Sequence, residues 1–177
     1  PTTLMVEWAS DRDGLLHEGS PDSAGITVFT ADGLTVGTHT IALTATDALG
    51  LYATTVSVLE VNGLPTAPMV RIEPSPARTT DTLSAAIDAE GMDPEGDSVS
   101  YRFEWSVSGE VRSESATVAP DQTVKSEEWT VRVIPTDGRG EGPAGTGERV
   151  ISNTVPVVEA VLIGPDPLAT DSLAVPI

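Results

Sequence analysis

Residues 38–50, THTIALTATDALG, alternate in character, with Ile41, Leu43 and Ala45 on one face and mostly threonine on the other. A period of two that is rich in β-branched residues predicts a half-buried strand. Residues 47–50 predict a turn, and 51–59 (LYATTVSVL) a second strand. The pattern recurs in residues 129–140, WTVRVIPTDGRG, where Asp137 and Gly140 repeat Asp47 and Gly50. The sequence therefore predicts a repeated β unit.

Length and composition agree with a chain built from such repeats. The 177 residues accommodate two units of about 90 residues each, a size that buries a modest core. There is no cysteine, so neither a disulfide framework nor a thiolate metal site is expected. Sixteen glycines and fourteen prolines fall among short alternating runs, a distribution typical of all-β sandwiches. We therefore expect an all-β fold.

The net charge of −18 restricts the partners. A chain this acidic is repelled by a polyanion, so nucleic acid is excluded as a partner. No apolar run reaches the length of a transmembrane helix, so no membrane insertion is expected. Calcium and basic surfaces remain as partners that fit the charge.

A third copy of the repeat begins at Asn153. Residues 153–177 align with 62–87 with one deletion, which places Ile163 under Ile72 and Ile177 under Ile87. We therefore expect one complete domain at 62–152, an incomplete domain at 1–61 that lacks its first two strands, and the first two strands of a further repeat at 153–177. Two interpretations follow: residues 153–177 complete residues 1–61 of a neighbouring chain, head to tail, or the sequence is a segment of a long tandem array.

The remaining elements are expected as short strands and loops. Alternation predicts strands at 3–9, 26–30, 69–73, 82–88, 99–107, 110–118, 128–135 and 148–152, and no helix. Residues 15–23 and the glycine-rich stretch 137–147 are expected to be irregular. Trp8 is expected to be the core tryptophan of its domain and the counterpart of Trp105.

Two motifs identify a family resemblance. The first is W-x-S-D-x-D-G-x-L with a following G-L-x-V-G-T-H-T-I, carried by Trp8, Ser10, Asp11, Asp13, Gly14, Gly33, Leu34, Val36, Gly37, Thr38, His39, Thr40 and Ile41, with Asp47 and Gly50. The second is the acidic loop 93–97 (DPEGD) before a Y-x-F-x-W strand. The chain resembles PKD-like and other immunoglobulin-like (cadherin-like) repeats of bacterial surface proteins. The resemblance implies tandem immunoglobulin-like sandwiches, related in fold to fibronectin III modules, at an extracellular or cell-surface location.

The acidic turns are the candidate metal site. Calcium takes six to eight oxygen ligands, often from alternate carboxylates beside a glycine. The candidate ligands are Asp93, Glu95, Asp97, Asp137, Asp11 and Asp13. In a tandem array the loops of one domain face the end of the domain before it, so an inter-domain calcium site is expected to stiffen the linker. The alternative is that these are ordinary turn residues on an acidic surface.

No catalytic motif stands out. His17 and His39 are the two histidines, and His39 begins a strand, so a packing role is expected. There is no G-x-S-x-G elbow and no Ser-x-x-Lys motif. The aromatic residues Trp8, Tyr101, Phe103, Trp105 and Trp129 alternate on core strands, so burial is expected over an exposed sugar-binding platform. We therefore expect a non-enzymatic structural module, a rigid spacer or a head-to-tail filament subunit. The alternative is an adhesin-type module that binds carbohydrate or a host protein.

Overall fold

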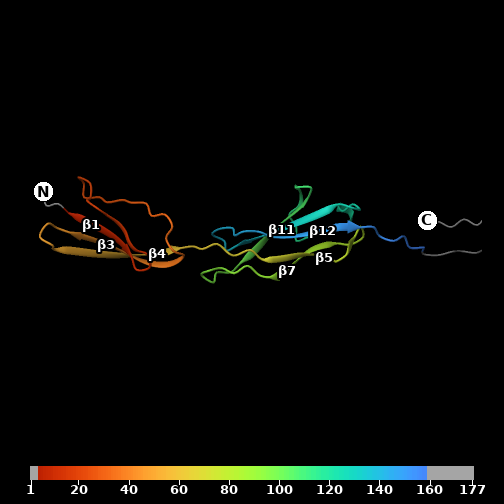
Figure 1. Ribbon diagram of the computed structural model, residues 1–177, viewed down its shortest axis with the longest axis horizontal. Coiled ribbons are helices and arrows are strands. Elements are labelled where there is room, and N and C mark those ends of the chain that lie inside the picture. Colours follow the sequence, from red (N-terminus) through yellow and green to blue (C-terminus); the bar gives the residue numbers. More distant parts are fainter. Residues whose placement is uncertain (1–3, 159–177) are drawn as a thin grey trace, which may run out of the picture.

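The computed structural model describes residues 4–158, which fold into two successive all-β units joined by residues 62–68 (Figure 1). Within these residues the one helical element is the short 3₁₀ helix η1 (Pro120–Gln122), and no helix is long and apolar enough to cross a membrane. The all-β prediction is confirmed.

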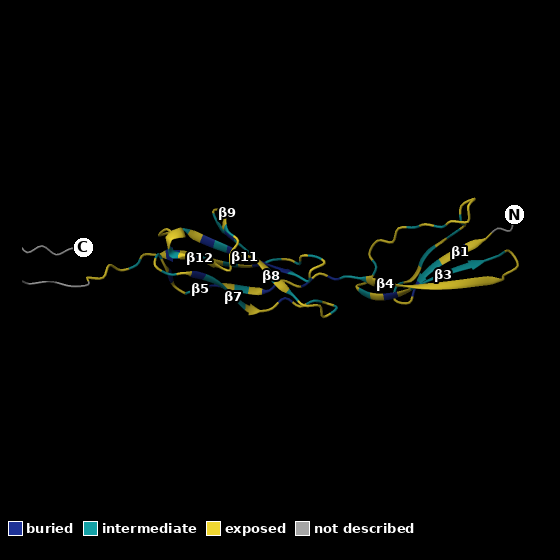
Figure 2. Cartoon of the chain, turned by 180° about the vertical axis from the view of Figure 1, so that it is seen from behind, coloured by how far each residue is buried: buried dark blue, intermediate teal, exposed yellow. Residues whose placement is uncertain are grey.

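The first unit contains one antiparallel sheet in the order β2-β1-β3-β4. Its strands are β1 (Met5–Ser10), β2 (Gly14–Gly19), β3 (Gly37–Thr46) and β4 (Tyr52–Val61). β3 and β4 pair along their whole length, from Gly37 opposite Val61 to Thr46 opposite Tyr52. The two strands predicted from residues 38–59 are therefore confirmed. β4 is exposed along nearly all of its length, as Figure 2 shows in yellow.

The second unit is an immunoglobulin-like sandwich of two sheets. One sheet has the order β10-β7-β5 and the other β6-β12-β11-β8-β9. The strands are β5 (Met69–Glu73), β6 (Ala77–Arg78), β7 (Leu83–Ala89), β8 (Ser100–Val107), β9 (Glu110–Ser113), β10 (Thr117–Val118), β11 (Glu128–Thr136) and β12 (Gly145–Ser152).

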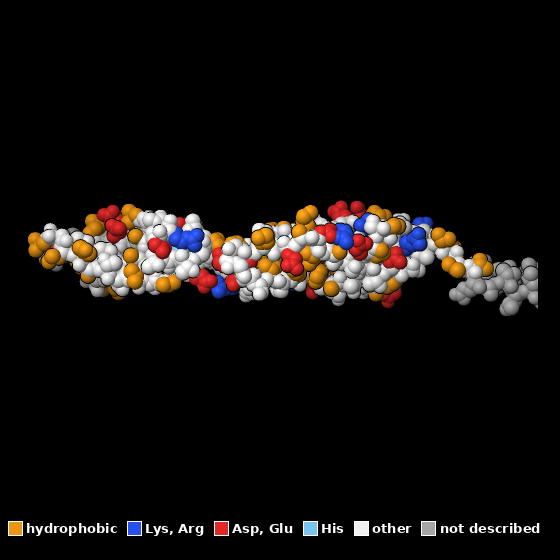
Figure 3. Space-filling model, turned by 90° about the horizontal axis from the view of Figure 1, so that it is seen from below, with side chains coloured by type: hydrophobic (Ala, Val, Ile, Leu, Met, Phe, Trp, Pro, Cys, Tyr) orange, Lys and Arg blue, Asp and Glu red, His pale blue; other side chains and the backbone are white. Residues whose placement is uncertain are grey.

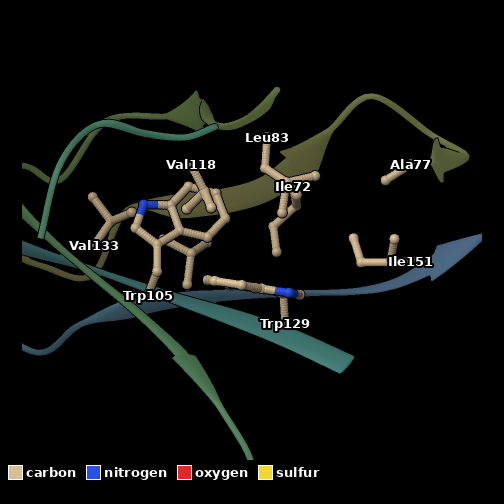
Figure 4. Close-up of a cluster of buried hydrophobic side chains, with 9 residues drawn as sticks. Ile72, Ala77, Leu83, Trp105, Val118, Trp129, Val133 and Ile151 are labelled. Carbon is tan, nitrogen blue, oxygen red and sulfur yellow. The ribbon is translucent and has the colours of Figure 1, made fainter. Parts of the chain in front are cut away.

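Side chains from both sheets of the second unit meet in one apolar core (Figure 4). Ile72, Leu83 and Val118 come from one sheet, and the rings of Trp105 and Trp129 come from the other and pack edge to face at 6.4 Å. Alternation of side chains along each strand places this set on the inner faces. The predicted burial of Trp105 and Trp129 is confirmed, while Trp8 in the first unit is only half-buried.

Four local predictions are wrong. The single strand expected over 110–118 is two strands, β9 and β10, which belong to different sheets. Residues 14–19, within the stretch expected to be irregular, form β2, an edge strand whose pairing with β1 contains a bulge. Its sequence GLLHEG does not alternate, so periodicity gave no signal. Residues 26–30, expected as a strand, have no strand pairing. β12 begins at Gly145, inside the expected loop, because Gly145 and Gly147 lie against the backbone of 68–72, which leaves no room for a side chain.

The match of Trp8 with Trp105 is also wrong, by two residues. Ser10 lies opposite Ile41, and Trp105 lies opposite Val131, the repeat counterpart of Ile41. Ser10 therefore occupies the position of Trp105. His39 lies ninety residues before Trp129 and is its counterpart. The first unit therefore has a serine–histidine pair at the positions where the second unit has its two tryptophans.

Candidate functional site

The serine–histidine pair is a buried structural contact. Ser10 Oγ lies 2.7 Å from His39 Nδ1, and His39 Nε2 lies 2.6 Å from the carbonyl oxygen of Thr35. A carbonyl oxygen only accepts, so Nε2 carries the hydrogen and the Ser10 hydroxyl donates to Nδ1. The oxygen of Ser10 also accepts from the backbone N–H of Arg12 and of Asp13, at 3.1 and 3.2 Å. The pair thus joins the 10–14 turn to the segment before β3.

This arrangement does not have the geometry of a nucleophile and base. The imidazole of His39 is 0% exposed, so a substrate cannot reach it. Asp13 Oδ2 lies 3.7 Å from Nδ1, the same nitrogen that faces Ser10. A catalytic carboxylate orients the opposite nitrogen from the one that meets the nucleophile. The packing role expected for His39 agrees with these contacts.

Asp11 and Asp13 hold first-unit backbone in place. Asp11 Oδ1 accepts from the N–H of Thr40 at 2.8 Å. The carboxylate of Asp13 accepts from the N–H and the hydroxyl of Thr35, at 2.9 and 2.8 Å. These hydrogen bonds from Thr35 favour the ionised form and lower the pKa of Asp13. Both carboxylates are therefore used within the first unit.

The two units meet at a junction formed by residues 60–63, from the end of β4 into the linker, and by two loops of the second unit, 93–97 and 137–140. Asp137 Oδ2 accepts from Asn62 Nδ2 at 2.8 Å, and its Oδ1 accepts from the N–H groups of Arg139 and Gly140, both at 2.7 Å. The bond from Asn62, followed by the backbone donors, lowers the pKa of Asp137. One carboxylate thus fixes both its own turn and the linker.

Arg139 adds an ion pair across the junction. Its Nη1 lies 3.1 Å from Glu60 Oε1 and donates to Asn62 Oδ1 at 3.4 Å. The hydrogen bond to Glu60 raises the pKa of Arg139. Both side chains of the pair are about half exposed, so solvent screens their attraction and the pair contributes little to stability. Its main effect is to fix the orientation of the 137–140 loop relative to Glu60.

Gly63 lies between side chains of the two units. A Cβ atom at this position would lie 2.8 Å from Val36 Cγ1 of the first unit and 2.8 Å from Pro94 Cγ of the second. The N–H of Gly63 donates to Glu95 Oε2 at 3.0 Å. The linker is therefore enclosed on both sides.

In the structure, the six predicted calcium ligands make different hydrogen bonds and contacts. Asp93 Oδ1 accepts from the N–H groups of Glu95 and Asp97, both at 3.0 Å, so it closes its own turn. Within residues 4–158, no three His, Cys, Asp or Glu side chains are grouped as a metal site. Asp93 Oδ2 is nevertheless buried without a hydrogen-bond partner, an observation that fits a cation. The calcium site stays a prediction.

Sequence reasoning missed Arg139 and Gly63. Arg139 is one of only nine basic residues in the chain, and it stands in the turn that repeats the Asp47 turn, where the first unit has Leu49. An arginine at the position where the other repeat has an apolar residue is the feature of the sequence that could have indicated the junction.

A hollow of about 440 Å³ opens on the inner face of the first unit. Its lining residues include Trp8, Leu16, Phe29, Leu34, Ile41 and Leu59. The rings of Trp8 and Phe29 lie 5.1 Å apart, and His17 stacks on Phe29 at 5.3 Å. Within residues 4–158, Phe29 and Leu34 of the 20–35 segment border the hollow together with apolar side chains of the sheet.

No family model matches the sequence, and no curated protein matches it. Among solved structures, the fibronectin(III)-like modules of Clostridium thermocellum CbhA are 18% identical over 86% of this chain and 80% of theirs, with a TM-score of 0.37. Domains FN1–FN3 of chicken CNTN1 are 11% identical over 85% of this chain and 54% of theirs, with a TM-score of 0.36. The fold assignment rests on the strand pairing described above, and the resemblance to PKD-like repeats stays a prediction.

Proposed function

We propose that this chain is a structural repeat module of a bacterial extracellular or cell-surface protein, and that it acts as a rigid spacer or as a head-to-tail filament subunit. The observation that carries the proposal is the junction, where Glu60 at the end of β4 and the linker residues Asn62 and Gly63 are each held by a loop of the second unit. A linker without such contacts lets two domains move independently. The acidic surface visible in Figure 3 suits a solvated spacer.

Residual dipolar couplings test the rigidity. In a rigid spacer the couplings of both units fit one alignment tensor. The double variant Asp137→Ala/Arg139→Ala removes the contacts to Asn62 and Glu60, so two tensors are expected for it. Arg112→Ala is the matched control, because Arg112 forms an exposed ion pair with Glu110 far along the second unit. Two tensors in the unaltered protein would remove the spacer proposal.

Calcium is a proposed stiffening ion at the same junction. It would use Asp93 Oδ2 and the nearby carboxylates of Glu95 and Asp97. A rise in melting temperature with millimolar calcium, absent from Asp93→Asn, supports the ion. No rise in the unaltered protein counts against it.

The hollow on the first unit favours a second candidate, an adhesin-type module for carbohydrate or a host protein. Trp8 and Phe29 border the hollow and present ring surface of the kind on which sugars stack. A glycan array separates the candidates: binding that Phe29→Ala abolishes supports the adhesin, and silence supports the spacer.

A further inference from the structure

The junction holds an asparagine that is followed by a glycine. The sequence has two asparagines, Asn62 and Asn153, and only Asn62 precedes a glycine. The backbone nitrogen that follows an asparagine can attack the side-chain amide carbon, and glycine leaves this nitrogen unshielded because it has no Cβ. Another residue at position 63 would be strained, since its Cβ would lie 2.8 Å from both Val36 Cγ1 and Pro94 Cγ. Packing between the units therefore requires the residue type that also makes Asn62 reactive.

The attacking nitrogen lies against a carboxylate. The N–H of Gly63 donates to Glu95 Oε2 at 3.0 Å, a distance at which a general base can remove a proton. Gly63 is buried, so this contact is less screened by solvent than an exposed one. Glu95 can accordingly take the proton that the nitrogen loses when it attacks.

The side-chain amide of Asn62 is held at both of its polar atoms. Its Oδ1 accepts from Arg139 Nη1 at 3.4 Å, and its Nδ2 donates to Asp137 Oδ2 and to the carbonyl oxygen of Gly63, both at 2.8 Å. The contact with Gly63 keeps the amide beside the residue whose nitrogen attacks. The guanidinium of Arg139 lies where negative charge develops on Oδ1 during the attack, the position of an oxyanion-stabilising donor. Asp137 orients the nitrogen that leaves.

We propose that Asn62 is a site of self-modification, at which the folded chain converts this asparagine into aspartate and isoaspartate. The Gly63 nitrogen bonds to Asn62 Cγ and passes its proton to Glu95, which returns a proton to Nδ2 as the Cγ–Nδ2 bond breaks. Ammonia leaves, and a cyclic imide then joins the side chain of Asn62 to the backbone. Water adds to either carbonyl of the imide and opens the ring, which gives aspartate or isoaspartate. Water is the only co-reactant.

Asn153 is the comparison within the same chain. It is the repeat counterpart of Asn62, and its Nδ2 likewise donates to the carbonyl oxygen of the next residue, Thr154, at 3.0 Å. Thr154 has a β-branched side chain beside the backbone nitrogen that would attack. Within residues 4–158, this contact is the one side-chain hydrogen bond that Asn153 makes. Asn153 should therefore persist while Asn62 reacts.

Peptide mapping by mass spectrometry tests the chemistry on the full chain. The chain is incubated at neutral pH in heavy-oxygen water, which labels each conversion that occurs during the assay. A calcium chelator keeps Glu95 free of metal. Asn62 should give labelled aspartate and isoaspartate at least about tenfold faster in the folded chain than in the same chain unfolded in urea.

The variants separate a general base from a general effect of charge. Glu95→Gln should remove the difference between the folded and the unfolded chain. Glu110→Gln is the matched control, because it removes an equal charge from an exposed ion pair with Arg112 and should keep the difference. The proposal is overturned by conversion that is no faster in the folded chain, that gives aspartate alone, or that Glu95→Gln leaves unchanged. The comparison of folded and unfolded chain does not depend on the stability of any variant.

The conversion should also loosen the junction, a consequence that rests on the proposed spacer function. Aspartate at position 62 has an oxygen in place of Nδ2, so two carboxylates would face each other where Asn62 now donates to Asp137. Dipolar couplings of Asn62→Asp should need two alignment tensors, whereas Asn153→Asp and the freshly prepared unaltered chain should each fit one. A single tensor for Asn62→Asp overturns the loosening. Two tensors for the fresh unaltered chain overturn the spacer proposal, and the mass measurement still decides the self-modification.

Discussion

Gly63→Ala should loosen the two units without unfolding either. The added methyl group would lie 2.8 Å from both Val36 Cγ1 and Pro94 Cγ, distances that real Cβ atoms do not adopt. The neighbours are branched or cyclic, so the linker must move. Overpacking of this kind costs about 1–3 kcal/mol. If this cost raises the free energy of the closed junction relative to an open form, the ratio of open to closed molecules rises about 5- to 150-fold.

Dipolar couplings and rotational diffusion measure the effect. The unaltered chain should tumble as one elongated body, and the Gly63→Ala chain should need two alignment tensors while the melting temperature of the second unit stays the same. Gly19→Ala is the control, because its methyl group would meet only the His17 side chain at 3.1 Å, far from the junction. Identical tensors for Gly63→Ala and the unaltered chain would refute the close approach as the source of rigidity.

Three further predictions concern stability. Ser10→Ala leaves His39 Nδ1 buried without its hydrogen-bond donor. The free energy of unfolding of the first unit, measured in urea, should therefore fall by about 1–3 kcal/mol. The control Ser57→Ala, at an exposed position, should leave it unchanged. Trp129→Ala removes a side chain that is 1% exposed and should destabilise the second unit by about 3–5 kcal/mol, with Val150→Ala, on the exposed surface, as the comparison. The pKa of Asp137 is lowered from 3.8, so its contribution is complete above about pH 4 and is lost as the pH falls through the lower folded value. Asp137→Asn should therefore flatten the decline in stability below about pH 4, and an unchanged slope would contradict the role assigned to the carboxylate.

Period-two alternation predicted β3, β8 and β11, each of which pairs with a strand on both sides. It also predicted β4, although β4 is an edge strand and is exposed along nearly all of its length. β2 escaped prediction because its sequence GLLHEG does not alternate. Residues 26–30 fail in the opposite sense: the local pattern is that of a strand, but a ladder needs a partner strand.

The sequence correctly placed the acidic residues at turns, but their spacing did not predict which groups their carboxylates bind. Asp93 and Asp137 each stabilise a turn by accepting backbone N–H groups, the ordinary use of aspartate at such positions. The junction depends on Gly63, whose importance lies in two side chains that are distant in sequence. Close approach of backbone to Val36 and Pro94 leaves no trace in the residues around Gly63.

The two buried pairs occupy equivalent positions in the two units but differ in the contacts that each requires. Trp105 and Trp129 pack against Ile72, Leu83 and Val118, so they need the opposing sheet in the same unit. Ser10 and His39 satisfy each other and the Thr35 carbonyl from their own layer. A tryptophan pair at that position would expose a large apolar surface whenever the opposing layer was missing. A hydrogen-bonded pair holds the sheet and its turns in order through contacts within its own layer, so Ser10 and His39 are expected to stabilise the first unit without an apolar partner from an opposing sheet.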